Sequence, residues 1–255
     1  MAGTVVAFFD LDHTLLDGSN GNIYAVQMAK EGYMPYRSLF WVGWYTFLYK
    51  INRLPRREVY RRVLDIMGRY TVLDMIGMMD RGFERYILPR LYKGGALLIE
   101  EHKRRGHLTV IATAAGEYIA ERVRAQLGAD DTIATTTPIK GDHMSSEIEV
   151  PTSFMEGKLE MAVEFCRRHG ARLEDCYFYS DSASDMPLLE AVGHPVMVNP
   201  QLRLRFAARG KGWPVIRFRE YAEFREVRRP QKALSKDMNR FVRLYEEALA
   251  TNPVE

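Results

Sequence analysis

The segment TVVAFFDLDHT, residues 4–14, begins with an apolar and β-branched run and ends with two aspartates and a threonine. Thr4 to Phe9 has the composition of a short strand that is buried on both faces of a parallel sheet. Asp10 and Asp12 follow this run directly. Because ligands bind beyond the carboxyl ends of the strands in open α/β sheets, we expect both carboxylates at a functional edge.

Further runs of the same kind alternate with helical patterns that end at glycine. The runs are residues 108–112, 176–179 and 195–198, and the helical patterns are residues 117–127, 157–169 and 185–191. This alternation is typical of βαβ units. It predicts an α/β fold with a Rossmann-like, doubly wound, mostly parallel sheet.

The alternation stops between residues 18 and 90, where the pattern is amphipathic, rich in aromatic residues and punctuated by prolines. We expect an all-helical insertion after the first strand, which could close as a cap over the sheet edge. The predicted domains are a core of residues 1–17 plus 91–230, a helical cap of residues 18–90 and a helical tail of residues 231–255. A hairpin is expected within residues 139–150 and a terminal amphipathic helix over residues 232–249.

Composition and charge restrict the class of protein. The chain has 255 residues, of which 47% are hydrophobic and 27% charged, as in ordinary globular proteins. The net charge of +3 does not indicate a nucleic-acid partner. Residues 203–243 nevertheless contain 13 Lys or Arg against 4 Asp or Glu. This basic segment is either a solvated face or a contact for RNA or an acidic membrane.

Cysteine content and apolar runs indicate the compartment. The 2 cysteines are too few for a disulfide framework. The N-terminus lacks the pattern of a signal peptide. The longest apolar run, residues 38–49, is shorter than the ~20 residues that span a bilayer. We therefore expect a cytoplasmic protein without a transmembrane segment.

A second pair of aspartates, Asp181 and Asp185, follows the run at residues 176–179. Four carboxylates at one sheet edge repel one another and need a cation, and Mg²⁺ prefers such oxygen ligands. A helix cap formed by Ser182 or Ser184 would account for Asp185 without a metal, but not for Asp181.

Thr113 ends the run at residues 108–112, and Lys158 begins the helix that follows Gly157. A hydroxyl group and a cation at this edge suit the oxygens of a phosphoryl group. The backbone N–H groups after Thr113, beginning with Ala114, could also hold an anion.

These motifs, in this order, resemble those of the haloacid dehalogenase-like (HAD) superfamily. The resemblance spans roughly Val5 to Pro200 and rests on D-x-D-x-T at residues 10–14, a threonine after the second strand, a lysine, and D-x-x-x-D at residues 181–185. The helical insertion and the sequence of the last motif are most similar to those of the phosphoserine-phosphatase-like subfamily (IB).

The resemblance implies a phosphatase with a covalent mechanism. Asp10 would attack phosphorus to form an aspartyl-phosphate, and Asp12 would act as the acid and then the base. Mg²⁺ would be bound by the Asp10 carboxylate, the Asp12 backbone carbonyl and Asp181. Thr14 and Asp185 would support the site. The phosphate would be bound by Thr113, Ala114 and Lys158.

The sequence departs from phosphoserine phosphatases at Ser19, where an acidic residue is typical, and at Ser184, where an asparagine is typical. We therefore expect a small phosphorylated metabolite other than phosphoserine as the preferred substrate. Histidinol phosphate and lysophospholipids are alternatives. A phosphotransferase that uses the same aspartyl-phosphate, or a non-catalytic phosphate-binding protein, also stays open.

Residues 33–45 contain six aromatic side chains. They could pack the core of the cap, receive an apolar substrate group or touch a membrane peripherally. The basic residues that follow include Arg62, which we select as a candidate for binding a second anionic group. The oligomeric state is not predicted.

Overall fold

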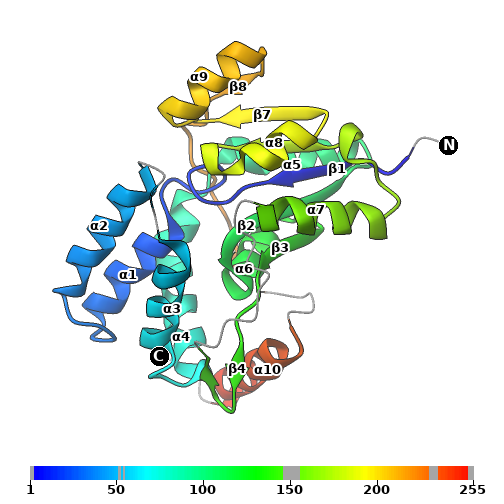
Figure 1. Cartoon of the computed structure of the whole chain (residues 1–255). Helices are drawn as coiled ribbons and strands as arrows, with labels where there is room; N and C mark the ends of the chain where they lie inside the picture. Colours follow the sequence, from blue (N-terminus) through cyan, green and yellow to red (C-terminus); the bar gives the residue numbers. More distant parts are fainter. Residues whose placement is uncertain (1–2, 51–52, 54, 146–155, 230–234, 252–255) are drawn as a thin grey trace. The chain divides into compact units, whose positions relative to one another are not determined.

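The computed structural model describes residues 3–50, 53, 55–145, 156–229 and 235–251 (Figure 1). The chain forms two compact units. The sheet unit comprises Met1–Asn20, Ile87–Thr135 and Pro151–Gln231, and the helical unit comprises Gly21–Tyr86, Thr136–Val150 and Lys232–Glu255.

The sheet unit contains a six-stranded sheet in the order β3-β2-β1-β6-β7-β8. All neighbouring strands in it are parallel. The strands are β1 (Val6–Phe9), β2 (Leu108–Gly116), β3 (Asp131–Thr135), β6 (Tyr177–Ser180), β7 (His194–Val198) and β8 (Val215–Ile216). The strand order reverses direction between β1 and β6, so the predicted doubly wound parallel sheet is confirmed. Ligands bind at such a reversal in this class of fold.

Helices cover both faces of the sheet (Figure 1). They are α5 (Lys93–Arg104), α6 (Glu117–Leu127), α7 (Glu156–Arg168), α8 (Met186–Ala191) and α9 (Leu202–Lys211), with short turns η2 (Leu88–Arg90), η3 (Leu173–Asp175) and η4 (Ala183–Asp185). Val6 and Phe8 lie in one apolar core with residues of α7, α8 and α9. Phe9 points to the other face, where its ring contacts His102 of α5. Burial on both faces explains the continuous apolar run of β1.

The structure contains elements that the sequence pattern does not predict, namely β3, β8, α5 and α9. β3 has only two apolar residues among its five, Ile133 and Ala134, and β8 has two residues in all. Neither therefore presents a recognisable apolar run. β2 also continues to Gly116, four residues beyond the predicted strand.

The helical unit contains α1 (Asn20–Lys30), α2 (Ser38–Lys50), α3 (Arg56–Met67), α4 (Val72–Gly82), the π-helical turn η1 (Phe83–Ile87) and α10 (Lys236–Thr251). Thr71 and Asp74 form a reciprocal capping box at the start of α4. α10 packs against α4 and buries Met238, Phe241 and Val242. Within the described ranges, no helix has both the length and the apolar character needed to cross a membrane.

A short hairpin, β4 (Ile139–Lys140) and β5 (His143–Met144), also belongs to the helical unit. The N–H of Val72 donates to the carbonyl of Asp142 at 2.7 Å, which joins the hairpin to the start of α4. Residues 146–150 of the predicted hairpin, and residues 232–234 of the predicted terminal helix, lie outside the described part of the chain.

Candidate active site

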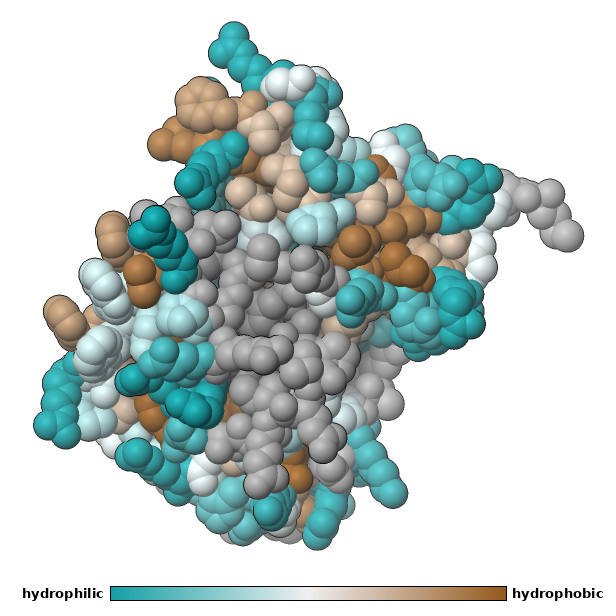
Figure 2. Space-filling model, viewed as in Figure 1, coloured by the Kyte–Doolittle hydropathy of each residue, from teal (hydrophilic) through white to brown (hydrophobic). Residues whose placement is uncertain are grey.

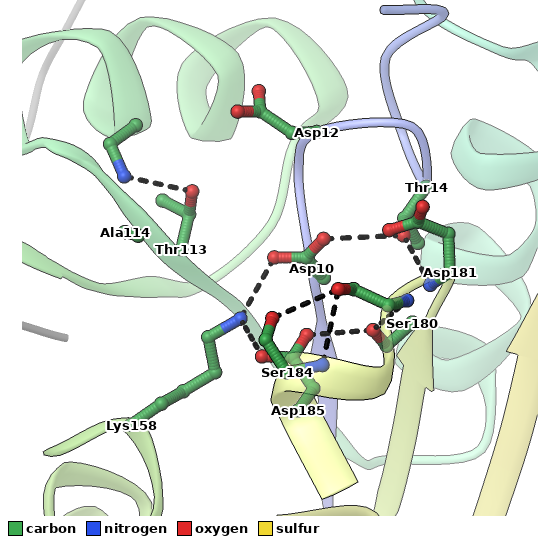
Figure 3. A network of polar contacts seen from close by, with 12 residues as sticks. Asp10, Asp12, Thr14, Thr113, Ala114, Lys158, Ser180, Asp181, Ser184 and Asp185 are labelled. Atoms are coloured by element: carbon green, nitrogen blue, oxygen red, sulfur yellow. Dashed lines mark hydrogen bonds and ion pairs between the residues drawn. The ribbon is translucent and has the colours of Figure 1, made fainter. Parts of the chain in front are cut away.

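Side chains from β1, β2, β6 and α7 gather at the carboxyl edge of the sheet (Figure 3). Phe9 of β1 pairs in register with Ile111 of β2 and Tyr179 of β6. The residues that follow these three positions therefore lie side by side. The parallel sheet thus brings the first, second and fourth sequence motifs to one place.

Lys158 holds two of the four aspartates. Its Nζ lies 2.9 Å from Asp10 Oδ1 and 2.8 Å from Asp185 Oδ1. All three side chains are at most 10% exposed. Burial opposes the charged form of Lys158, but the carboxylates of Asp10 and Asp185 outweigh this effect and raise its pKa. Lys158 therefore stays protonated and neutralises part of the buried negative charge.

The hydroxyl of Thr14 connects the first and fourth motifs. Thr14 Oγ1 accepts a hydrogen bond of 3.0 Å from the backbone N–H of Asp181 and donates one of 3.3 Å to Asp10 Oδ2. Thr14 is fully buried. Because its oxygen accepts from the backbone, its proton is directed at Asp10, which fixes the orientation of that carboxylate.

Asp181 and Asp185 have different partners. Asp181 Oδ2 accepts 2.9 Å from Gln201 Nε2, whereas Asp185 Oδ2 accepts 2.7 Å from Ser180 Oγ. Ser182 accepts from the N–H of Ser184 at 3.2 Å, so the predicted serine cap is present. Asp185 makes no side-chain cap to α8. Its position therefore follows from Lys158 and Ser180 rather than from a helix cap.

Asp12 is turned away from the lysine and is only partly buried. The backbone N–H of Asn20 donates to its Oδ1 at 3.0 Å, and Asn20 Nδ2 lies 2.7 and 2.9 Å from its two oxygens. Ser19 Oγ donates more weakly, at 3.4 Å. Burial raises the pKa of Asp12, and the hydrogen bonds from Asn20 lower it in part. A carboxyl group with a raised pKa is suited to carry a proton in acid–base catalysis.

Thr113 and Ala114 lie where β2 changes register, between Ala112 and Gly116. Thr113 is buried, and its Oγ1 accepts the N–H of Ala115 at 3.1 Å. The carbonyl of Ala114 accepts from Thr135 Oγ1 at 3.0 Å. These bonds shape the end of β2 beside Asp10 (Figure 3).

Arg62 belongs to the helical unit. It is exposed, pairs with Glu58 at 2.8 Å and lies over the ring of Trp41 at 5.7 Å. Its role toward a substrate stays a prediction.

The electrostatics of the sheet-edge residues fit a divalent cation. Burial raises the pKa of Asp10 to about 7, against the opposing effect of Lys158. Burial and the charge of Asp10 raise the pKa of Asp181 well above its usual range. One lysine therefore does not satisfy these buried carboxylates, and an oxygen-preferring cation would relieve their repulsion.

In the part of the chain that the structure describes, no group of three His, Cys, Asp or Glu side chains could by itself hold a metal ion. A metal at this edge would therefore need other oxygen ligands besides carboxylates. Mg²⁺ accepts such a set, because it binds through one or two carboxylates and completes its shell with water, phosphate or other oxygens.

Sequence reasoning missed three residues that orient the aspartates: Asn20, Ser180 and Gln201. Gln201 follows β7, so the rule that ligands lie beyond the carboxyl ends of strands could have indicated it. Ser180 directly precedes the fourth motif and received no role. Asn20 carries no such signal, because it stands at the start of a helix outside the motifs.

Comparison with known proteins agrees with this geometry. The family model for haloacid dehalogenase-like hydrolases matches residues 7–190, so the chain belongs to this family. A probable phosphatase of Mycobacterium tuberculosis, Rv3661, is 29% identical over 86% of this chain and 77% of its own length. A histidinol-phosphatase of Neisseria meningitidis is 28% identical over 84% of this chain and 99% of its own.

A solved structure of a phosphoserine phosphatase with an analogue of its phospho-aspartyl intermediate has the same fold. Its TM-score is 0.66 with 17% identity, and the match covers 86% of this chain and 96% of that one. The predicted resemblance to the HAD superfamily is confirmed, and the chain is an enzyme of its hydrolase class.

Proposed function

We propose that this protein is a Mg²⁺-dependent phosphatase that hydrolyses a small phosphomonoester through an aspartyl-phosphate on Asp10. The observation that carries the proposal is the environment of Asp10. Its carboxylate is held by Lys158 and Thr14 at the carboxyl end of β1, with Thr113 on the neighbouring strand. The relatives named as phosphatases and the phosphoserine phosphatase fold support this reading.

In the first step, a carboxylate oxygen of Asp10 forms a bond to phosphorus, and the bond between phosphorus and the ester oxygen breaks. The electron pair goes to the leaving oxygen, which takes a proton from Asp12. Asn20 holds the Asp12 carboxyl group for this transfer. The need for an acid also explains why the second aspartate suits phosphoryl transfer, since a halide leaves without a proton.

In the second step, water attacks phosphorus and gives up its proton to Asp12. The bond between phosphorus and Asp10 then breaks and restores the Asp10 carboxylate, with inorganic phosphate as the product. The ammonium of Lys158 and the hydroxyl and backbone N–H groups at Thr113 and Ala114 would bind the phosphoryl oxygens.

The residues that would hold Mg²⁺ are Asp10, Asp181 and the backbone carbonyl of Asp12, with Asp185 supporting the site through Lys158. When bound, the cation would offset the negative charge of the carboxylates and the phosphoryl group. Gln201 and Thr14 orient this donor set through Asp181 and Asp10.

Phosphoserine is proposed not to be the preferred substrate. The acidic residue typical of phosphoserine phosphatases is replaced by Ser19, whose hydroxyl contacts Asp12 rather than supplying a charge. A much higher kcat/KM for phosphoserine than for histidinol phosphate or a lysophosphatidate would contradict this part.

The direct test is release of inorganic phosphate from a panel of phosphomonoesters with Mg²⁺, with Asp10→Asn as the matched variant. We expect turnover that depends on Mg²⁺ and is lost in the variant. Disappearance of substrate without release of phosphate would indicate a phosphotransferase instead. Equal turnover by Asp10→Asn would overturn the proposal.

A further inference from the structure

An aromatic stripe runs along the exposed side of α2. It consists of Phe40, Trp41, Trp44 and Phe47 of α2 and of Tyr36, which lies in the turn just before the helix. Phe40, Trp44 and Phe47 follow one another at intervals of four and three residues, which places them on one side of the helix. The five side chains are 64%, 72%, 49%, 46% and 51% exposed, in sequence order.

The other side of α2 is partly buried. Thr46, which lies away from the stripe on the helix, donates to Asn22 Oδ1 of α1 at 3.1 Å. α2 is therefore anchored by one side and presents large apolar groups on the other. Figure 2 shows apolar side chains projecting at the edge where Figure 1 places α2. A contiguous apolar surface of this kind marks an interaction site.

The sequence around the stripe is basic. Residues 32–57 contain five Lys or Arg and no Asp or Glu. Exposed Arg37 directly follows Tyr36. The guanidinium of Arg62 lies 5.7 Å from the ring of Trp41. Glu58 pairs with Arg62 at 2.8 Å, so the positive charge available beside the stripe comes from the other basic residues, such as exposed Arg37.

We propose that the aromatic stripe docks on an anionic phospholipid bilayer. Tryptophan and tyrosine favour the boundary between headgroups and hydrocarbon, and arginines beside them bind lipid phosphates. A second copy of this chain fits the surface less well, because two such faces would bring together segments that each carry seven Lys or Arg against one acid, Glu58, over residues 32–62. An anionic bilayer supplies the opposite charge.

The test uses tryptophan fluorescence with lipid vesicles. The chain has 3 tryptophans, and Trp213→Phe leaves only Trp41 and Trp44, both in the stripe. We expect a blue-shifted emission, and quenching by brominated lipid, with vesicles of phosphatidylcholine and phosphatidylglycerol. The shift should be absent with phosphatidylcholine alone and should weaken as salt is added.

Phe40→Ser combined with Phe47→Ser should lower the vesicle-bound fraction about tenfold. In the parent protein both phenylalanine rings would move from water into the bilayer on binding, and the variant loses this gain. The matched control is Leu202→Ser combined with Phe206→Ser on α9, whose side chains are 70% and 73% exposed and lie beside arginines. The control should bind vesicles as the parent does. Circular dichroism and thermal unfolding check that each variant is folded.

Three results would overturn the proposal. The first is no binding to phosphatidylglycerol vesicles at low salt by the folded parent. The second is an equal loss of binding in the α9 control. The third is self-association of the parent, measured by light scattering, that is abolished by Phe40→Ser with Phe47→Ser while vesicle binding is unaffected. This result would assign the stripe to a contact with a second copy of the chain.

Discussion

Lys158 Nζ lies 2.9 Å from Asp10 Oδ1, although the two residues are 148 positions apart in the chain. The same ammonium lies 2.8 Å from Asp185 Oδ1. One cation thus connects the proposed nucleophile to the fourth motif inside a buried cluster, so its loss should affect activity and stability together.

Lys158→Met should lower kcat/KM by about 10²- to 10³-fold, because a charge that stabilises the phosphoryl oxygens is removed. It should also destabilise the fold at pH 8 by about 3–5 kcal/mol, since Asp10 and Asp185 lose their buried cation. The loss of stability should shrink as the pH falls, because burial raises the pKa of Asp10, and a protonated Asp10 no longer needs the cation. Denaturant unfolding at several pH values measures this.

The matched control for Lys158 is Lys103→Met, which removes a partly exposed ion pair with Asp130 at 3.0 Å. Its effect should stay below about 1 kcal/mol. A destabilisation by Lys158→Met that is the same at pH 8 and pH 5 would argue against charge compensation as its role.

Asn20→Ala should lower kcat about 10- to 100-fold, because Asp12 loses the side-chain hydrogen bonds that orient it. These bonds lower the pKa of Asp12, so their removal raises it further. The limb of the pH profile of kcat that Asp12 sets should therefore move to higher pH. Asn22→Ala, two residues further along α1, is the control, and an unmoved profile in Asn20→Ala would contradict this role.

Gln201→Ala should raise the Mg²⁺ concentration for half-maximal activity by about 10- to 100-fold, since Asp181 loses a partner that orients it. At saturating Mg²⁺ kcat should recover most of its value. Gln126→Ala removes a glutamine that bonds the backbone of Glu226 and Arg228 in the same unit and should leave the Mg²⁺ dependence unchanged. Equal Mg²⁺ requirements in both variants would contradict a role of Gln201 in Mg²⁺ binding.

Acid should destabilise the sheet unit through His102. Burial lowers the pKa of His102 to about 4, from 6.5 in the unfolded chain. The unfolded state therefore binds a proton first as the pH falls below 6.5. This costs up to about 3 kcal/mol of stability by pH 4.

His102→Asn tests this effect of acid. At pH 7 the variant should be less stable than the parent, because the ring nitrogens of His102 bond Tyr179 and His107 at 2.8 and 2.9 Å. The deficit should narrow as the pH is lowered from 7 to 4. Chemical denaturation of both proteins across this range measures it, and a deficit that stays constant would show that His102 does not titrate as described.

The part of the fold that could be predicted is the part with strong local patterns. β1, β6 and β7 contain continuous apolar runs, and α6 begins and ends at the predicted residues, Glu117 and Leu127. β3 and β8 were missed because their register is set by the neighbours β2 and β7 rather than by their own composition.

In the site, too, residues within local sequence patterns could be predicted, whereas contacts that depend on tertiary structure could not. Asp10 and Asp181 could be placed at one edge because each follows a buried strand, and parallel topology brings strand ends together. The contacts of Asn20 and Gln201 could not be predicted, since they depend on how a helix start and the turn after β7 approach a carboxylate in three dimensions.

The most direct measurement of the central claim is mass spectrometry of acid-quenched enzyme after a single turnover of an activated phosphomonoester with Mg²⁺. Asp12→Asn should be used, because loss of the base slows hydrolysis of the intermediate. The account predicts an adduct with the mass of one phosphoryl group on the peptide that contains Asp10, and no adduct when Asp10→Asn is added. Turnover without any adduct, or an adduct on another residue, would contradict it.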